Sequence, residues 1–151
     1  RQTMNEFIIA LGWLGVFAPM GLGALGSAIG VALAGQAAIG AMLETDGNYG
    51  RYLGVSLMPS SNVIYGIVVR FSLQQPITAQ NGGALFGIGI ITAPVLLYAG
   101  AYQGRVCASA IAASKTKPEI FGLSLAPAAI VEGFQVFAFV FALVLAGYIE
   151  S

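Results

Sequence analysis

One carboxylate lies inside an otherwise apolar stretch of this sequence. The stretch AAIVEGFQVFAFVFALVLAGYI, Ala128 to Ile149, contains Glu132 and no Lys, Arg or His that could pair with it. In a helix over residues 119–149, Glu132 lies about 13 residues from the start, ~20 Å along the axis and close to the middle of a bilayer. A charge there costs at least ~2.5–3.5 kcal/mol, so we expect the carboxyl group to be protonated or to hold a cation.

Oxygen-bearing side chains elsewhere in the apolar sequence could complete a cation site around Glu132. They are Ser60, Ser61, Asn62 and Tyr65 in the segment MPSSNVIYG, and Gln103 in the segment AYQG. Pro59 lacks a backbone donor, which can free a carbonyl such as that of Val55 or a neighbour. Each polar residue alone, and a neutral Glu132, also fits an ordinary interhelical hydrogen bond. Because hard cations prefer hydroxyl, amide, carbonyl and carboxylate oxygens, the whole set favours an ion-binding site.

The composition is that of a membrane protein. Hydrophobic residues make up 58% of the chain and charged residues 8%, against roughly 25% charged in an average globular protein, and the mean hydropathy is +0.86. So few charges cannot cover a water-facing surface. A net charge of zero gives no reason to expect a nucleic acid partner. The absence of His and the single Cys107 exclude a histidine metal site, an internal disulfide and a cysteine metal cluster.

Three polar, turn-forming segments divide the sequence into four apolar segments that can each cross a bilayer, which takes about 20 helical residues. The breaks are ETDGNYGR, SLQQPITAQNGG and SKTKPE, and the apolar segments are 7–43, 50–71, 84–113 and 119–149. The first is predicted as one helix of ~55 Å and not as two short crossings broken near Pro19, because no polar loop lies within it. It is too long for the apolar region of a secretory signal, so we expect it to be part of the structure.

The two halves of the sequence repeat the same order of features. NYGRYLGVSLMPSSNVIYGIVV (48–69) aligns with EIFGLSLAPAAIVEGFQVFAFV (119–140), and Ser60 falls where the second half has Glu132. We therefore expect two duplicated hairpins, residues 1–75 and residues 76–151, of which only the second carries the acid. The predicted fold is an all-α membrane protein with four transmembrane helices.

Small residues at helical spacing mark the first and third segments. Gly26, Gly30 and Ala34 form one such row, and Gly100, Gly104 and Ala108 another, whereas the fourth segment is rich in Phe. Small residues let helix backbones approach closely in lipid. The rows fit packing within one chain. They also fit the arrangement we favour, a closed ring in which the first and third helices of many copies line a narrow inner circle.

Basic residues predict the orientation in the membrane. Lys115, Lys117, Arg51 and Arg105 lie near the two loops inside the hairpins, and only Arg1 and Arg70 lie near the termini and the central loop. The positive-inside rule then places the hairpin loops in the cytoplasm and both termini outside.

The segments SSNVIYG, YQGRV and AAIVEGF, in a duplicated Gly-rich hairpin, resemble the proteolipid (K or c) subunit of V-type rotary ATPases of the bacterial sodium type. The resemblance covers essentially the whole chain. It implies a rotor ring of identical subunits in the lipid of a bacterial cell membrane, turning against a stator subunit that supplies an Arg and joined to a central stalk subunit. It also implies the roles of six residues: Glu132 as the ion-carrying carboxylate, Gln103, Ser61 and Asn62 as further ligands of the ion, Tyr65 as a hydrogen-bond donor to the glutamate, and Met58 through its backbone carbonyl.

The resemblance favours Na⁺ over H⁺ as the carried ion. Ser61 and Asn62 stand where the sodium-type members have Thr and Gln and where the proton-type members tend to be apolar. Because Asn is shorter than Gln, it stays open whether Asn62 reaches the ion directly. Gln103 is the strongest argument for Na⁺, since a proton needs no further oxygen ligands. The chain itself is expected not to be an enzyme: it has no Gly-x-x-x-x-Gly-Lys-Ser/Thr loop, so ATP chemistry would belong to soluble partners.

Two other functions stay open at this point. A small four-helix proton-coupled antiporter also uses a membrane glutamate, but we would expect that acid in the first helix beside an aromatic substrate cavity. Here the acid lies in the last helix, and the single Trp13 is far away in the sequence. A purely structural ring or pore with a neutral Glu132 is the other alternative. The size of the purified oligomer separates them, because a dimer indicates an antiporter and a large closed ring a rotor.

Overall fold

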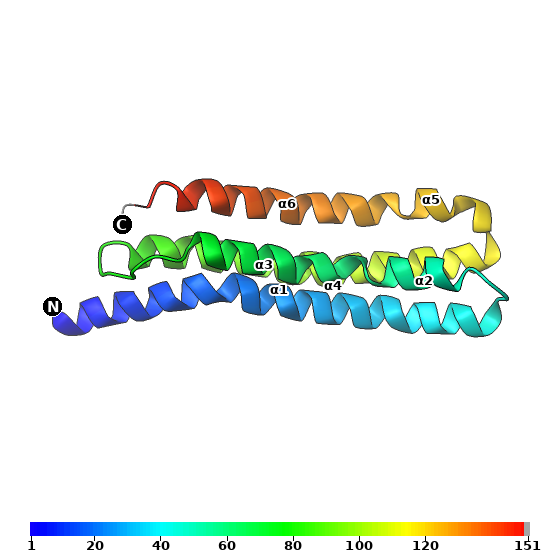
Figure 1. Ribbon diagram of the computed structural model, residues 1–151, viewed down its shortest axis with the longest axis horizontal. Coiled ribbons are helices and arrows are strands. Elements are labelled where there is room, and N and C mark those ends of the chain that lie inside the picture. The colour runs from blue at the N-terminus through cyan, green and yellow to red at the C-terminus, as the bar shows by residue number, and fades with distance from the viewer. Residues whose placement is uncertain (150–151) are drawn as a thin grey trace.

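The computed structural model describes residues 1–149, which form a bundle of four long helical crossings (Figure 1). In chain order the elements are α1 (Gln2–Glu44), α2 (Tyr49–Ser56), η1 (Met58–Ser60), α3 (Ser61–Ser72), α4 (Gly82–Thr116), η2 (Pro118–Ile120), α5 (Phe121–Ser124) and α6 (Ala126–Ala146). All four crossings are long and apolar enough to span a membrane, and the described residues contain no strand. The predicted all-α membrane fold is confirmed. The last two residues of the predicted second hairpin, 150 and 151, lie outside the described part.

The first and third crossings are unbroken helices. α1 runs for 43 residues with Pro19 inside it, and α4 runs for 35 residues with Pro94 inside it. The prediction that the first apolar segment forms one long helix is therefore confirmed. Both helices extend beyond the predicted segments by a few residues, as is usual where polar residues continue the last helical turns.

The second and fourth crossings are each interrupted next to a proline. The second passes from α2 through the 3₁₀ turn η1, which contains Pro59, into α3. The fourth was expected as one helix over 119–149, but it consists of η2, α5 and α6, with Pro127 at the start of α6. The physical reason is that a proline has no N–H for the helical ladder and its ring crowds the preceding turn. Glu132 is still the midpoint of the whole segment Pro118–Ala146, as the sequence predicted.

Glycines let α1 and α4 pack backbone to backbone. A Cβ atom added to Gly30 or Gly104 would overlap the backbone of the facing helix, and Gly26 and Gly100 meet in the same way. The two rows of small residues seen in the sequence thus face each other within one chain. This packing accounts for them without further copies, and the lining of a ring by these helices stays a prediction.

α6 is the outermost helix of the bundle. It packs on α3 and α4 and makes no contact with α1 in the described residues, and Figure 1 shows it on the far side of α3 and α4 from α1. Only Ala128, Gln135 and Ala142 of α6 are buried, while bulky side chains such as Phe137 and Phe141 are exposed. α6 therefore contacts the bundle along one narrow seam and leaves a broad apolar face outside.

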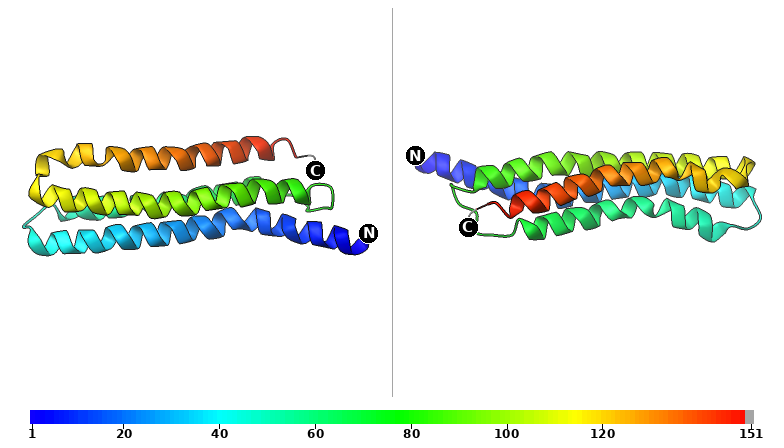
Figure 2. Two further views of the ribbon diagram at one scale, coloured as in Figure 1. Left: turned by 180° about the vertical axis from the view of Figure 1, so that it is seen from behind. Right: turned by 90° about the horizontal axis from the view of Figure 1, so that it is seen from above.

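The loops inside the two hairpins lie at the same end of the bundle. Lys115 Nζ of α4 lies 2.7 Å from Glu44 Oε2 at the end of α1, and the guanidinium of Arg51 lies 4.8 Å from the centre of the Phe121 ring. The start of α1, the central loop and the end of α6 lie at the opposite end (Figures 1 and 2). This arrangement is the one that the predicted orientation requires.

Candidate cation-binding site

Glu132 is held by two of the predicted partners. The Tyr65 hydroxyl on α3 donates to Glu132 Oε1 at 3.4 Å, and the Gln103 side-chain amide on α4 donates to Glu132 Oε2 at 3.2 Å. The same Gln103 Nε2 also lies 3.4 Å from the carbonyl oxygen of Ala128, one turn before Glu132 on α6. Three helices thus converge on one half-buried carboxylate, each oxygen of which accepts one hydrogen bond.

Two further predicted residues, Ser61 and Met58, bond to each other, and no hydrogen bond in residues 1–149 joins either of them to Glu132. The Ser61 hydroxyl donates to the Met58 carbonyl oxygen at 3.3 Å, across the break between η1 and α3. Gln135 Nε2 on α6 in turn donates to Ser61 Oγ at 3.2 Å. Gln135 was not among the predicted site residues. Its position could have indicated it. Gln135 is the one amide side chain in the apolar stretch of residues 128–149, and it lies three residues after Glu132, on the same helix face.

The Asn62 side chain, unlike those of Gln103 and Tyr65, does not hydrogen-bond to Glu132 in the part of the chain that the structure describes. Its Nδ2 donates to the Pro59 carbonyl at 2.9 Å, and the residue is fully buried against Gly23 of α1 and Gly100 of α4. No hydrogen bond in residues 1–149 joins Asn62 to Glu132. The role of Asn62 as a ligand of the ion stays a prediction.

The break at Pro59 is held from α1 by Ser27, which the sequence did not indicate. Ser27 Oγ donates to the Pro59 carbonyl oxygen at 2.8 Å and accepts the backbone N–H of Val63 at 3.0 Å. The carbonyls at this break that accept side-chain donors are those of Leu57, Met58 and Pro59, with Ser60 Oγ donating to Leu57 at 2.7 Å. No side-chain hydrogen bond to the Val55 carbonyl is found in residues 1–149. Ser27 thereby positions the turn that carries Ser61 and Asn62.

Three side-chain oxygens around this site lack donors. They are Asn62 Oδ1, Gln103 Oε1 and Gln135 Oε1, each buried and without a hydrogen-bond partner in the described part of the chain. A buried acceptor without a partner costs about 1–3 kcal/mol. A cation could satisfy several such oxygens at once, and Gln103 Oε1 belongs to a side chain that already contacts Glu132.

The oxygen-bearing side chains around Glu132 would suit a small hard cation of low charge. Residues 1–149 contain no group of three or more His, Cys, Asp or Glu side chains able to hold a metal ion. The available ligands are oxygens of amides, hydroxyls and carbonyls with a single carboxylate, a set that hard cations prefer and soft transition metals do not. One negative charge balances one monovalent ion.

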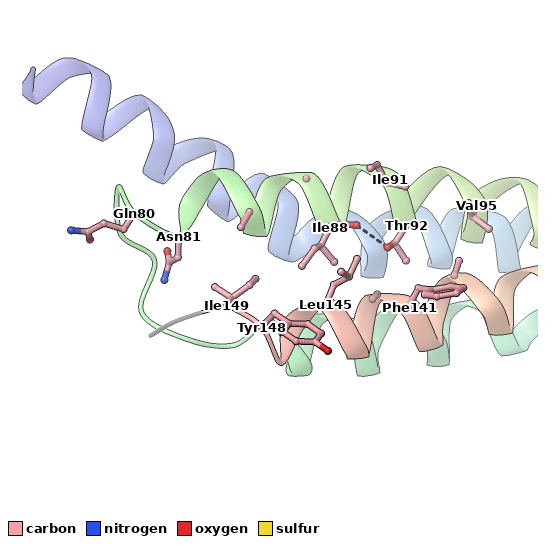
Figure 3. Close-up of a pocket in the computed structure, with 14 residues that line it drawn as sticks. Gln80, Asn81, Ile88, Ile91, Thr92, Val95, Phe141, Leu145, Tyr148 and Ile149 are labelled. Carbon is pink, nitrogen blue, oxygen red and sulfur yellow. Dashed lines mark hydrogen bonds between the residues drawn. The ribbon is translucent and has the colours of Figure 1, made fainter.

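Two grooves on the bundle do not include this site. The larger, of about 760 Å³, lies between α4 and α6 toward the end of α6 and is lined mainly by apolar side chains such as Ile88, Ile91 and Phe141 (Figure 3). The smaller, of about 440 Å³, is lined by apolar and aromatic residues of the same two helices. Glu132 lines neither groove, although its neighbours Val131 and Phe134 on α6 line the smaller one.

Four crossing helices with one half-buried carboxylate among oxygen-bearing side chains define a membrane proteolipid built from two hairpins. The model of the ATP synthase C-subunit family matches residues 14–73 and again residues 86–145. The chain therefore belongs to this family, as a two-repeat proteolipid subunit of the V-type ATPase kind. Each match covers one pair of crossings, which confirms the duplicated hairpins, while the boundary between residues 75 and 76 stays a prediction.

Two relatives are similar over most of the chain. The A-type ATP synthase subunit K of Methanocaldococcus jannaschii is 30% identical over 159 residues, covering 95% of this chain and 72% of the relative. The V-type sodium ATPase subunit K of Enterococcus hirae is 30% identical over 125 residues, covering 80% of each chain. With four apolar crossings, this membership defines an integral, multi-pass membrane protein.

Proposed function

We propose that this chain is a rotor-ring subunit of the membrane sector of a V-type ATPase, and that it carries one cation at Glu132. The observation that carries the proposal is the carboxylate at the midpoint of the fourth crossing, bound by Gln103 and Tyr65. The similarity to a sodium ATPase subunit K supports it. The chain does no covalent chemistry, and soluble partner subunits hydrolyse or make ATP.

The carried ion is Na⁺ in preference to H⁺. A protonated Glu132 has one O–H and can satisfy one of the buried amide oxygens near it. A sodium ion can be coordinated by several oxygens at once. Gln103 can supply one of them, because its Nε2 donates to the carboxylate while its Oε1 accepts no hydrogen bond. The ligands are Glu132, Gln103 and Ser61, with Asn62 as a further candidate, and H⁺ is the alternative ion.

The proposed rotation depends on how the net charge of the ion-binding site changes when the ion binds and leaves. With Na⁺ bound, the carboxylate is neutral in net effect, and the site can face lipid without the cost of a buried charge. Beside an Arg of a stator subunit, the empty carboxylate is stabilised and the ion leaves. A potential of 100 mV supplies ~2.3 kcal/mol for each charge moved across the membrane.

The assembly is a closed ring of identical subunits, in contact with lipid, a stator subunit and a central stalk. The broad exposed apolar face of α6 suits contact with lipid or neighbouring subunits. The hairpin loops, with Arg51 and Lys115 near them, face the cytoplasm and the termini face outward. The membrane is a bacterial cell membrane.

Carbodiimide labelling of Glu132 in the purified oligomer, across pH and with or without Na⁺, tests this function. The reagent attacks a protonated carboxyl group, so a carboxylate that holds Na⁺ is protected. We expect Na⁺ to suppress labelling and the suppression to weaken as the pH falls, because protons compete for the same oxygens. Labelling that depends on pH and not on Na⁺ would show that the carried ion is a proton. No labelling under any condition would contradict an ion-carrying role for Glu132.

A further inference from the structure

Gln135 occupies a position in the α6 seam where an apolar residue would be expected. The buried residues of α6 are Ala128, Gln135 and Ala142, spaced seven residues apart, so that one glutamine lies between two alanines along the contact with α3 and α4. Its side chain is completely buried. A buried polar group inside a membrane helix is costly unless it has partners, which makes a functional role the first hypothesis.

The contacts of Gln135 connect the two parts of the site. It lies three residues after Glu132 on α6, so both side chains point from the same face of the helix. Its Nε2 donates to Ser61 Oγ at 3.2 Å, and Ser61 donates onward to the Met58 carbonyl at 3.3 Å. The helix that carries the carboxylate is thereby tied to the predicted ligands Ser61 and Met58.

The other end of the Gln135 amide is free. Its Oε1 is buried and has no hydrogen-bond partner among residues 1–149. Gln103 has the same arrangement, with Nε2 bound to Glu132 and Oε1 unpartnered. An amide held by its N–H, with its carbonyl oxygen buried and unpaired, is oriented in advance to accept a cation.

We propose that Gln135 is a ligand of the cation carried at Glu132, through its side-chain carbonyl oxygen. This assignment rests on the proposed function and adds a residue to its site. Gln135 supplies from α6 the amide oxygen that Asn62, held on the Pro59 carbonyl, does not bring to the carboxylate. The ion, of the size and charge of Na⁺, is then bound by Glu132, Gln103, Gln135 and Ser61.

The test measures the Na⁺ concentration that half-protects Glu132 from carbodiimide labelling in the purified oligomer at fixed pH. The variants are Gln135→Leu and, as a matched control, Gln36→Leu, the same change at an exposed position of α1. We expect Gln135→Leu to raise the half-protecting concentration at least ~10-fold, Gln36→Leu to leave it unchanged, and all forms to be labelled without Na⁺. An unchanged concentration in Gln135→Leu would overturn the assignment. If Na⁺ does not protect even the wild-type protein, the proposed sodium function fails, a result distinct from failure of Gln135 alone.

Three further variants cover loss of assembly and an indirect role. Gln135→Met keeps the length and flexibility of the side chain without the amide, and it replaces Gln135→Leu if that variant does not assemble. The pair Ser61→Ala and Ser61→Ala/Gln135→Leu separates binding from positioning. If Gln135 binds the ion itself, the double variant binds Na⁺ more weakly than Ser61→Ala, although the two effects need not multiply because the side chains are in contact. If the double variant is no weaker than Ser61→Ala, Gln135 only orients the serine hydroxyl and is not a ligand.

Discussion

Gln103 and Glu132 meet across the interface of α4 and α6, where the glutamine amide donates to Glu132 Oε2 at 3.2 Å. The opposite end of the same amide, Oε1, is buried and unpaired. Gln103 can therefore hold the carboxylate and offer an oxygen to a bound ion at the same time. This double role distinguishes it from Tyr65, whose hydroxyl is placed to donate to the carboxylate.

Gln103→Leu is expected to weaken Na⁺ binding more than any change that removes only a hydrogen bond to the carboxylate. The variant loses an ion ligand and a donor together, and we expect the Na⁺ dissociation constant to rise ~10–100-fold. Calorimetric titration of the purified oligomer with Na⁺ measures it. Gln36→Leu, at an exposed position, is the matched control. A dissociation constant within twofold of the wild type would show that Gln103 Oε1 does not bind the ion.

Tyr65→Phe is expected to have a smaller effect. It removes one hydrogen bond to Glu132 Oε1, worth about 0.5–1.5 kcal/mol, so Na⁺ binding should weaken about two- to tenfold. The ring contact with Phe139, at 5.2 Å between centroids, stays in place. Thermal unfolding of the purified oligomer should therefore change little. A large fall in thermal stability would mean that the Tyr65 hydroxyl acts mainly in holding the helices together.

Gly104→Ala tests the close contact of α1 and α4. A Cβ atom at residue 104 overlaps the backbone of Gly30, so the helices must separate, at a cost of about 1–3 kcal/mol or more. We expect a lower yield of assembled protein and a lower midpoint of thermal unfolding. Gly54→Ala on α2 is the control, because an added Cβ meets no atom within 4 Å there. Equal stability of the two variants would contradict the packing of these helices through glycine.

Ser27→Ala tests whether α1 holds the break at Pro59. The change leaves the Pro59 carbonyl and the Val63 N–H without their hydroxyl partner, and we expect a loss of about 1–3 kcal/mol in stability. Ser109→Ala on α4 is the control, because that hydroxyl is exposed and bonds only to the Arg105 carbonyl of its own helix. Thermal unfolding of both variants measures the difference, and equal midpoints would show that Ser27 does not stabilise the turn.

The sequence predicted the features that depend on composition and on position along a helix. The four crossings, the unbroken α1 and the place of Glu132 at the centre of its crossing all follow from the lengths of the apolar segments. Oxygen chemistry placed Gln103 and Tyr65 in the candidate set around Glu132, and the resemblance to a family assigned each its role. Nothing local to those residues indicates which side of a helix faces the acid.

Two contacts between distant segments were not predicted from the sequence. The interaction of Gln135 with Ser61 joins residues 74 positions apart, and that of Ser27 with Pro59 joins residues 32 apart. Both depend on how the helices are rotated about their axes, which no local pattern determines. The interrupted start of the fourth crossing was missed for another reason: hydrophobicity continues across Pro127, although the helical ladder does not.

The most direct test of cation binding at Glu132 is equilibrium binding of radioactive Na⁺ to the purified oligomer, for the wild-type chain and for Glu132→Gln. Glu132→Gln keeps the shape of the side chain and removes its charge. We expect saturable binding of about one Na⁺ per wild-type chain, weakening as the pH falls, and none in the variant, because one carboxylate supplies the only negative charge of the site. Saturable binding that persists in Glu132→Gln, or its absence in the wild type, would contradict the central claim.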